Sequence, residues 1–238
     1  MAFLSIDDQK LDVPQQRTDA WFKQRKNRIT GSRLSEFNFI STEEALREYY
    51  GIIWEGAPKP PFTEEQRGWM AWGVEHEPIA TADFIKHFPE YVILECPFYP
   101  HPCGWIGASP DGTYYRVKDG KVVEQGCIEI KTPAKHKRPY PYVKDYYISQ
   151  MYFEMACTGM RRTIFISWGP KCMRAWLLIW RDDYWQALCN LLYAFRRKDL
   201  PFPEFLELQH EMLRIQKEIV EESKPLHSGK GIDVRGST

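Results

Sequence analysis

Residues 127–133 read CIEIKTP, and this stretch decides how the centre of the chain folds. The alternation places Ile128 and Ile130 on one face of a β-strand. Glu129 and Lys131 then share the opposite face. An acid and a lysine at this spacing usually face solvent, so the neighbouring sequence must decide whether they lie in a site instead.

The residues before this strand predict a β-hairpin. Strands over 112–117 and 121–131 are joined through Asp119-Gly120, a strong turn signal. The segment GASPDGTYY (107–115) places Asp111 at the entry to this hairpin, close to Glu129 on the return strand. Two adjacent carboxylates raise each other's pKa unless a cation lies between them.

Such a pair of acids suits a hard cation. Mg²⁺ and Mn²⁺ prefer oxygen ligands and take a substrate phosphate as a further ligand. Lys131, on the same face, would orient or help deprotonate the attacking water and offset phosphate charge. The Asp, Glu and Lys side chains together indicate hydrolysis of a phosphodiester.

Two other segments add polar groups to this set. WGVEHEPIA (72–80) puts Glu75 and Glu77 on different sides of a helix, and one of them can reach the acids. Gln150 lies in an otherwise aromatic helix, where a buried amide needs a partner. An ordinary charged helix remains the alternative for 72–80.

The segment 17–33 predicts an anion site. A short helix capped by Thr18 or Asp19 is expected to turn Trp21 and Phe22 inward, with Gly31-Ser32 opening a second helix. Free backbone N–H groups at a helix start bind phosphate. The alternative is a solvated helix face. The basic residues are Arg17, Lys23, Arg25, Lys26, Arg28 and Arg33.

The rest of the chain alternates helices and strands. Helices are predicted over 42–50, 64–88, 141–158 and 182–198, and strands over 91–99, about 104–108, 161–169 and 174–181. We expect a main domain over 1–200 with its core at about 70–182, a C-terminal helix over 201–222, and a disordered tail over 223–238. The C-terminal helix is amphipathic and should pack on the domain rather than on another subunit. Its apolar residues are Phe205, Leu208, Met212, Ile215 and Ile219.

Composition argues against a strongly basic, secreted or membrane-spanning protein. Lys and Arg number 32, as do Asp and Glu, so any basic surface must be local. The six cysteines form no C-x-x-C pair, and His101 with Cys103 lacks further metal ligands nearby. The first residues do not resemble a secretory signal, and no apolar run reaches membrane-spanning length. These features predict a cytoplasmic protein in a reducing compartment.

Taken together, the motifs resemble the PD-(D/E)XK nucleases. Asp111 followed by Glu129-Ile130-Lys131 matches their signature, and the wider set is similar to the lambda-exonuclease (YqaJ-type viral recombinase) branch. The matching segments are WFKQRKNRITGSR, WGVEHEP, GASPDG, IEIKTP and YISQMYFEMACTG, which span roughly residues 17–160. The resemblance implies an α/β fold with a restriction-endonuclease-like core, a mixed β-sheet flanked by helices.

The resemblance also implies roles for individual residues. Metal ligands would be Glu77, Asp111, Glu129 and the carbonyl of Ile130, and catalytic residues Asp111, Glu129, Lys131 and Gln150. The 5′-phosphate pocket would use Arg25, Ser32 and Ser109, with Arg28 sharing or replacing Arg25. Contacts to the DNA backbone are expected from Lys135, Lys137 and Arg138, for which a solvated loop is the alternative.

The implied activity is Mg²⁺-dependent 5′-to-3′ digestion of linear double-stranded DNA, leaving 3′ single-stranded overhangs, with Mn²⁺ as an alternative metal. Family members form trimeric rings around DNA and act beside a single-strand annealing protein. Related iron–sulfur nucleases use a closely spaced cysteine group that this chain lacks, so no cluster is expected.

Two other functions fit the same fold. An endonuclease acting on DNA or RNA would use the same metal site but would not need a terminal-phosphate pocket. A catalytically inert DNA-end-binding protein would need neither the acids nor the lysine.

Overall fold

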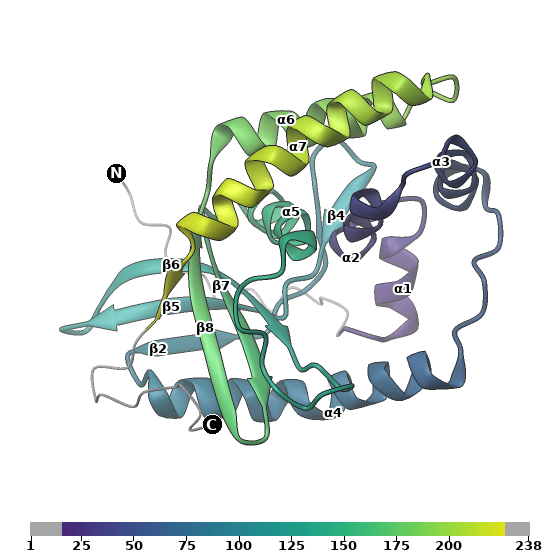
Figure 1. The fold of residues 1–238 in the computed structure, drawn as a ribbon. Coiled ribbons are helices and arrows are strands. Elements are labelled where there is room, and N and C mark those ends of the chain that lie inside the picture. The colour runs from purple at the N-terminus through teal and green to yellow at the C-terminus, as the bar shows by residue number, and fades with distance from the viewer. Residues whose placement is uncertain (1–15, 227–238) are drawn as a thin grey trace.

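A six-stranded sheet forms the centre of the computed structural model, which describes residues 16–226 (Figure 1). Its strands lie in the order β2 (Tyr91–Leu94), β5 (Gly112–Lys118), β6 (Lys121–Lys131), β7 (Arg162–Gly169), β8 (Cys172–Ile179) and β9 (Lys224–Pro225). β6 and β7 run parallel, whereas the other neighbouring pairs are antiparallel. The sheet is therefore mixed, as predicted.

Helices cover both faces of this sheet. α4 (Glu64–His87) lies along one face, and α5 (Ile148–Thr158) lies on the other (Figure 1). α6 (Asp182–Phe195) and α7 (Phe202–Glu222) run side by side beyond α5. Because α5 connects β6 to the parallel strand β7, it forms the crossover that such a pair requires.

The alternation in β6 divides its side chains between the two faces. Ile128 and Ile130 pack with Ala80 and Phe84 of α4. Cys127 belongs to the apolar cluster on the α5 side. Glu129 therefore points toward α5, where it is fully buried rather than facing solvent.

The hairpin between β5 and β6 brings Asp111 to this strand. Asp119 and Gly120 both have positive φ, 51° and 72°, as a type I′ turn requires. The resulting register pairs Gly112 with Ile128. The backbone N–H of Asp111 then donates to the carbonyl of Ile128 at 3.1 Å, which anchors the acid-bearing turn.

A small second sheet aligns the N-terminal segment with the same turn. Its order is β1 (Ile29–Thr30), β4 (Ile106–Ala108) and β3 (Tyr99–Pro100), with β1 and β4 parallel. β1 leads directly into α2 (Gly31–Leu34), and β4 leads directly into Ser109. The pairing therefore brings the chain around Ser32 beside the chain around Ser109.

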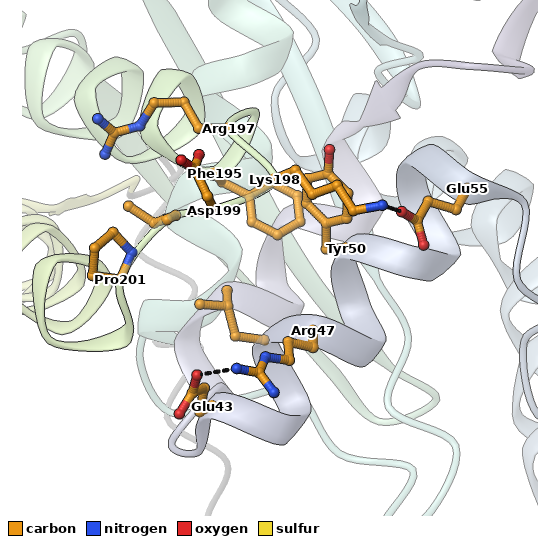
Figure 2. A pocket seen from close by; sticks show the side chains of 11 residues that line it. Glu43, Arg47, Tyr50, Glu55, Phe195, Arg197, Lys198, Asp199 and Pro201 are labelled. Carbon is orange, nitrogen blue, oxygen red and sulfur yellow. Dashed lines mark hydrogen bonds and ion pairs between the residues drawn. The ribbon is translucent and has the colours of Figure 1, made fainter.

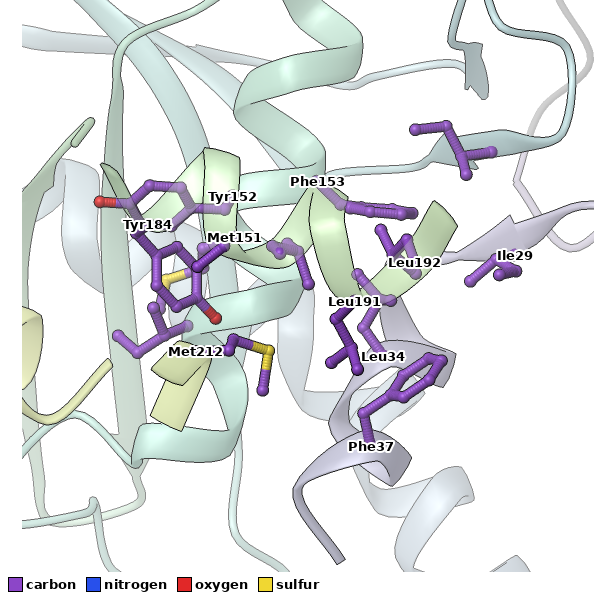
Figure 3. Close-up of a cluster of buried hydrophobic side chains, with 14 of the residues drawn as sticks. Ile29, Leu34, Phe37, Met151, Tyr152, Phe153, Tyr184, Leu191, Leu192 and Met212 are labelled. Carbon is purple, nitrogen blue, oxygen red and sulfur yellow. The ribbon is translucent and has the colours of Figure 1, made fainter. Parts of the chain in front are cut away.

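The larger apolar core joins the N-terminal segment to the helices (Figure 3). Leu34 and Phe37 pack in it with side chains of α5 and α6, and Met212 extends it to α7. Gln209 of α7 is buried and donates to the carbonyls of Phe37 and Ile40. The C-terminal helix therefore packs on the domain, as expected.

Several boundaries differ from the predictions. The strand predicted over 91–99 ends at Leu94, because Pro97 lacks the N–H that a ladder needs. The helix predicted over 141–158 begins at Ile148 after a 3₁₀ turn, Asp145–Tyr147, since prolines at 139 and 141 keep the chain extended. The short helix, α1 (Asp19–Arg25), buries Trp21 but leaves Phe22 57% exposed, so the prediction for Phe22 was wrong.

The remaining elements complete the description. α3 (Glu43–Tyr50) continues as a π-helical turn, Gly51–Glu55, and a 3₁₀ turn, Ser35–Phe39, follows α2. Of the tail predicted over 223–238, residues 224–225 form β9, and 227–238 lie outside the described residues. Between residues 16 and 226, none of the helices is long and apolar enough to cross a membrane.

Candidate active site

The structure brings together the three side chains of the signature. Asp111 Oδ2 accepts a hydrogen bond from the backbone N–H of Ile130 at 2.7 Å. Lys131 Nζ forms an ion pair with Glu129 Oε1. The predicted Asp, Glu and Lys set therefore exists as one cluster at the end of β6.

Burial and mutual repulsion control the charges of this cluster. Burial, followed by the charge of Glu129, raises the pKa of Asp111 well above its usual range. Burial alone would lower the pKa of Lys131, but the carboxylates of Glu129 and Asp111 outweigh it and raise that pKa. The protonated form of Lys131 is therefore favoured, and in that form it can neutralise phosphate charge.

The buried amide of Gln150 finds its hydrogen-bond partners in two carboxylates. Its Nε2 donates to Glu129 Oε1 at 2.7 Å and to Glu154 Oε1 at 3.0 Å. Glu154 is 1% exposed and was missed in the sequence, although its i, i+4 spacing from Gln150 on α5 was a usable signal. The amide thus holds Glu129 from the side opposite to the sheet.

Glu154 gives a prediction for stability against pH. Burial, then the charges of Glu129 and Asp111, raise the pKa of Glu154 well above its usual range. A carboxyl group with a raised pKa destabilises the folded state when the pH exceeds about 4.3, the pKa of this group in the unfolded state. Below that pH the destabilisation disappears. Glu154→Gln should therefore raise the free energy of unfolding by about 1 kcal/mol at pH 8, and not at all near pH 3.5. Urea denaturation at both pH values measures this, and an equal gain at both would contradict it.

The structure distinguishes between the two acids of α4. Glu77 lines a cavity of about 730 Å³ together with Asp111 and Ile130. Its carboxylate forms an ion pair with Arg17, with 2.6 Å between Nη2 and Oε2. The side chain of Glu75 is 73% exposed and lies beside His76. Glu77 is therefore the acid of this pair that faces the cluster.

The donor set fits a hard divalent cation. Glu129 Oε2 is buried without a hydrogen-bond partner among the described residues, and Glu77, Asp111 and Ile130 line one cavity. Carboxylate and carbonyl oxygens of this kind are the ligands that a hard cation prefers. In the part of the chain that the structure describes, no three His, Cys, Asp or Glu side chains already converge as a metal site. Each of the three carboxylates has a partner: Lys131 pairs with Glu129, Arg17 pairs with Glu77, and the backbone N–H of Ile130 donates to Asp111.

A second cluster contains three of the residues predicted to bind a terminal phosphate. Arg25 Nη2 lies 3.3 Å from the hydroxyls of Thr30 and Ser32. Its guanidinium lies 4.0 Å from the Trp21 ring centroid, and the Trp21 indole N–H donates to Ser109 at 2.9 Å. Trp21, expected only as a core residue, therefore links Arg25 to Ser109.

Arg25 keeps its charge in this pocket. Burial, then the neighbouring Arg33, lowers the pKa of Arg25 to about 10. A half-buried guanidinium beside two hydroxyls is a suitable phosphate ligand. Because α2 has only four residues, this pocket depends on side chains rather than on a helix dipole.

The other predicted basic residues lie elsewhere. Arg28 Nη1 donates to the carbonyl of Gln24 at 2.6 Å, so this guanidinium turns back to α1 rather than to Ser32 or Ser109. Lys135, Lys137 and Arg138 are exposed on the loop after β6. Lys137 Nζ lies 4.5 Å from the Trp72 ring centroid, so this loop reaches α4.

A separate cavity of about 400 Å³ lies between α3 and the turn joining α6 to α7 (Figure 2). Arg47 pairs with Glu43 on its wall, and Lys198 pairs with Glu55. None of the acids in the cluster lines it. Its charges neutralise each other, and we assign it no chemical role.

Comparisons with known proteins identify the family and the fold. Residues 20–161 match the profile of the YqaJ-like viral recombinase domain. The crystal structure of an alkaline exonuclease (LHK-Exo) from Laribacter hongkongensis has 24% identity and a TM-score of 0.56, covering 86% of this chain and 100% of that chain. A structure of LHK-Exo in complex with dAMP has the same identity and coverage and a TM-score of 0.51. A search of curated proteins found no match. These likenesses confirm the predicted fold class, and the chain belongs to the YqaJ-like viral recombinase domain family.

Proposed function

We propose that the protein is a metal-dependent 5′-to-3′ exonuclease that digests one strand of linear double-stranded DNA and leaves 3′ single-stranded overhangs for recombination or repair. The observation that carries this proposal is the position of the Arg25 pocket. Ser109, which the pocket includes, is separated from Asp111 by a single residue. A terminal phosphate held there would lie near the acids that we propose as ligands of the catalytic metal.

Each residue of the cluster has a role in this reaction. Glu77, Asp111, Glu129 and the Ile130 carbonyl would hold Mg²⁺ or Mn²⁺, which polarises the scissile phosphate and lowers the pKa of the attacking water. Lys131 would offset the charge that develops on the phosphate. Gln150 would keep Glu129 in place through its 2.7 Å hydrogen bond. Lys135, Lys137 and Arg138 would contact the DNA backbone.

Family membership and an exonuclease relative support the same proposal. We further propose a homotrimeric ring around the duplex and cooperation with a single-strand annealing protein, both from the family resemblance. Among the residues described, all members of the signature are present and clustered, which disfavours an inert DNA-end-binding protein.

A comparison of DNA ends tests the proposal. In Mg²⁺, a 5′-phosphorylated linear duplex should yield mononucleotides and a 3′ overhang, while a covalently closed circle of the same sequence stays intact. The exonuclease needs an end to fill the Arg25 pocket, whereas an endonuclease does not. Gel electrophoresis measures the digestion of both substrates. Rapid cutting of the circle would reject the exonuclease in favour of an endonuclease.

A further inference from the structure

Arg17 holds a carboxylate that the proposed reaction needs for metal binding. Its guanidinium lies 2.6 Å from Glu77 Oε2, and both side chains line the cavity that also contains Asp111 and Ile130. A guanidinium and a divalent cation repel each other at such short range. The two therefore compete for Glu77.

The backbone around Arg17 fixes this arrangement. Arg17 has φ of 70°, a left-handed conformation that costs free energy for any residue except glycine. Gln16 Nε2 donates to the carbonyls of Pro110 at 2.9 Å and Cys96 at 3.2 Å. The neighbouring residue is thus tied to the turn that carries Asp111. Strained non-glycine residues of this kind concentrate at functional sites.

We propose that Arg17 is a positioning residue with two alternative partners. Without a divalent cation it neutralises Glu77 and keeps this carboxylate directed into the cavity. When the cation takes Glu77, the freed guanidinium binds a phosphate of the DNA strand in the same cavity, because phosphate is the anion that then enters and guanidinium pairs with it in bidentate geometry. The inference deepens the proposed function and rests on it for the identity of the phosphate.

Metal titration without DNA tests the pairing of Arg17 with Glu77. Isothermal titration calorimetry with Ca²⁺ should show Arg17→Ala binding about 10-fold more tightly than the wild type, because no guanidinium has to be displaced. Arg17→Lys should stay close to the wild type. Arg17→Gly removes the side chain and the backbone strain together, so agreement with Arg17→Ala assigns the effect to the guanidinium.

DNA binding tests the pairing of Arg17 with a phosphate of the DNA strand. Fluorescence anisotropy with a 5′-phosphorylated duplex should show Arg17→Ala binding about 10-fold more weakly in Ca²⁺, but equally to the wild type in EDTA. Lys121→Ala, which removes an exposed positive charge at the far end of β6, controls for general electrostatics. Thermal melting in EDTA confirms that each variant is folded.

Two results would overturn the proposal. One is unchanged Ca²⁺ affinity in Arg17→Ala, and the other is an equal change in DNA affinity with and without Ca²⁺. The calorimetric result does not depend on DNA, so it separates this inference from the exonuclease assignment, which the circle experiment decides.

Discussion

Lys131→Ala and Glu129→Ala should each lower the rate of Mg²⁺-dependent digestion of linear duplex by about 10³-fold. Glu129 would hold the metal, and its buried carboxylate also pairs with Lys131 and accepts from Gln150. Lys131 is kept protonated by this acid and by Asp111, so its loss removes a positive charge where negative charge develops. Release of acid-soluble nucleotides from a labelled duplex measures both rates.

Stability needs a control in this experiment, because removing Lys131 leaves a buried carboxylate without its cation. Lys131→Met preserves the side-chain volume, and thermal melting shows whether it folds. Lys121→Ala lies on the same strand at its exposed end and should digest DNA at the wild-type rate. All variants should still bind DNA ends. Undiminished digestion by both Glu129→Ala and Lys131→Ala would remove these residues from the mechanism.

Replacing the 5′-phosphate of the duplex with a hydroxyl should slow the wild type by about 10- to 100-fold, and Arg25→Ala should abolish this preference. Arg25 is the cation of the pocket and lies near the hydroxyls of Thr30 and Ser32. Since the pKa of Arg25 is about 10, the guanidinium loses its charge only as the pH rises through that value. The preference should therefore persist from pH 7 to pH 8.5. Initial rates on the two duplexes measure it.

Arg28→Ala is the matched control for Arg25→Ala. It removes the same charge three residues later, but its guanidinium turns back to the Gln24 carbonyl. We expect it to retain the preference for a 5′-phosphate. A preference that survives in Arg25→Ala and disappears in Arg28→Ala would move the pocket to Arg28.

Local patterns in the sequence determined the type of the main elements, although not all of their boundaries. The alternation of Ile128 and Ile130 set the two faces of β6, and the Asp119-Gly120 pair set the hairpin. The apolar spacing in 202–222 set α7. Each of these depends on residues that are neighbours in the chain, and short-range geometry decides them. Family motifs added the candidate site residues, since their order along the chain is visible without coordinates.

Only the tertiary structure decided how those residues contact one another. The sequence placed Glu75 and Glu77 on one helix, but the packing of α4 on the sheet left one exposed and turned the other into the cavity. The same packing joined Arg17 to Glu77 across 60 positions of sequence. Glu154 became part of the cluster because α5 covers β6, which buries both carboxylates. Burial and long-range pairing arise from how elements pack, and spacing along a single chain does not contain that information.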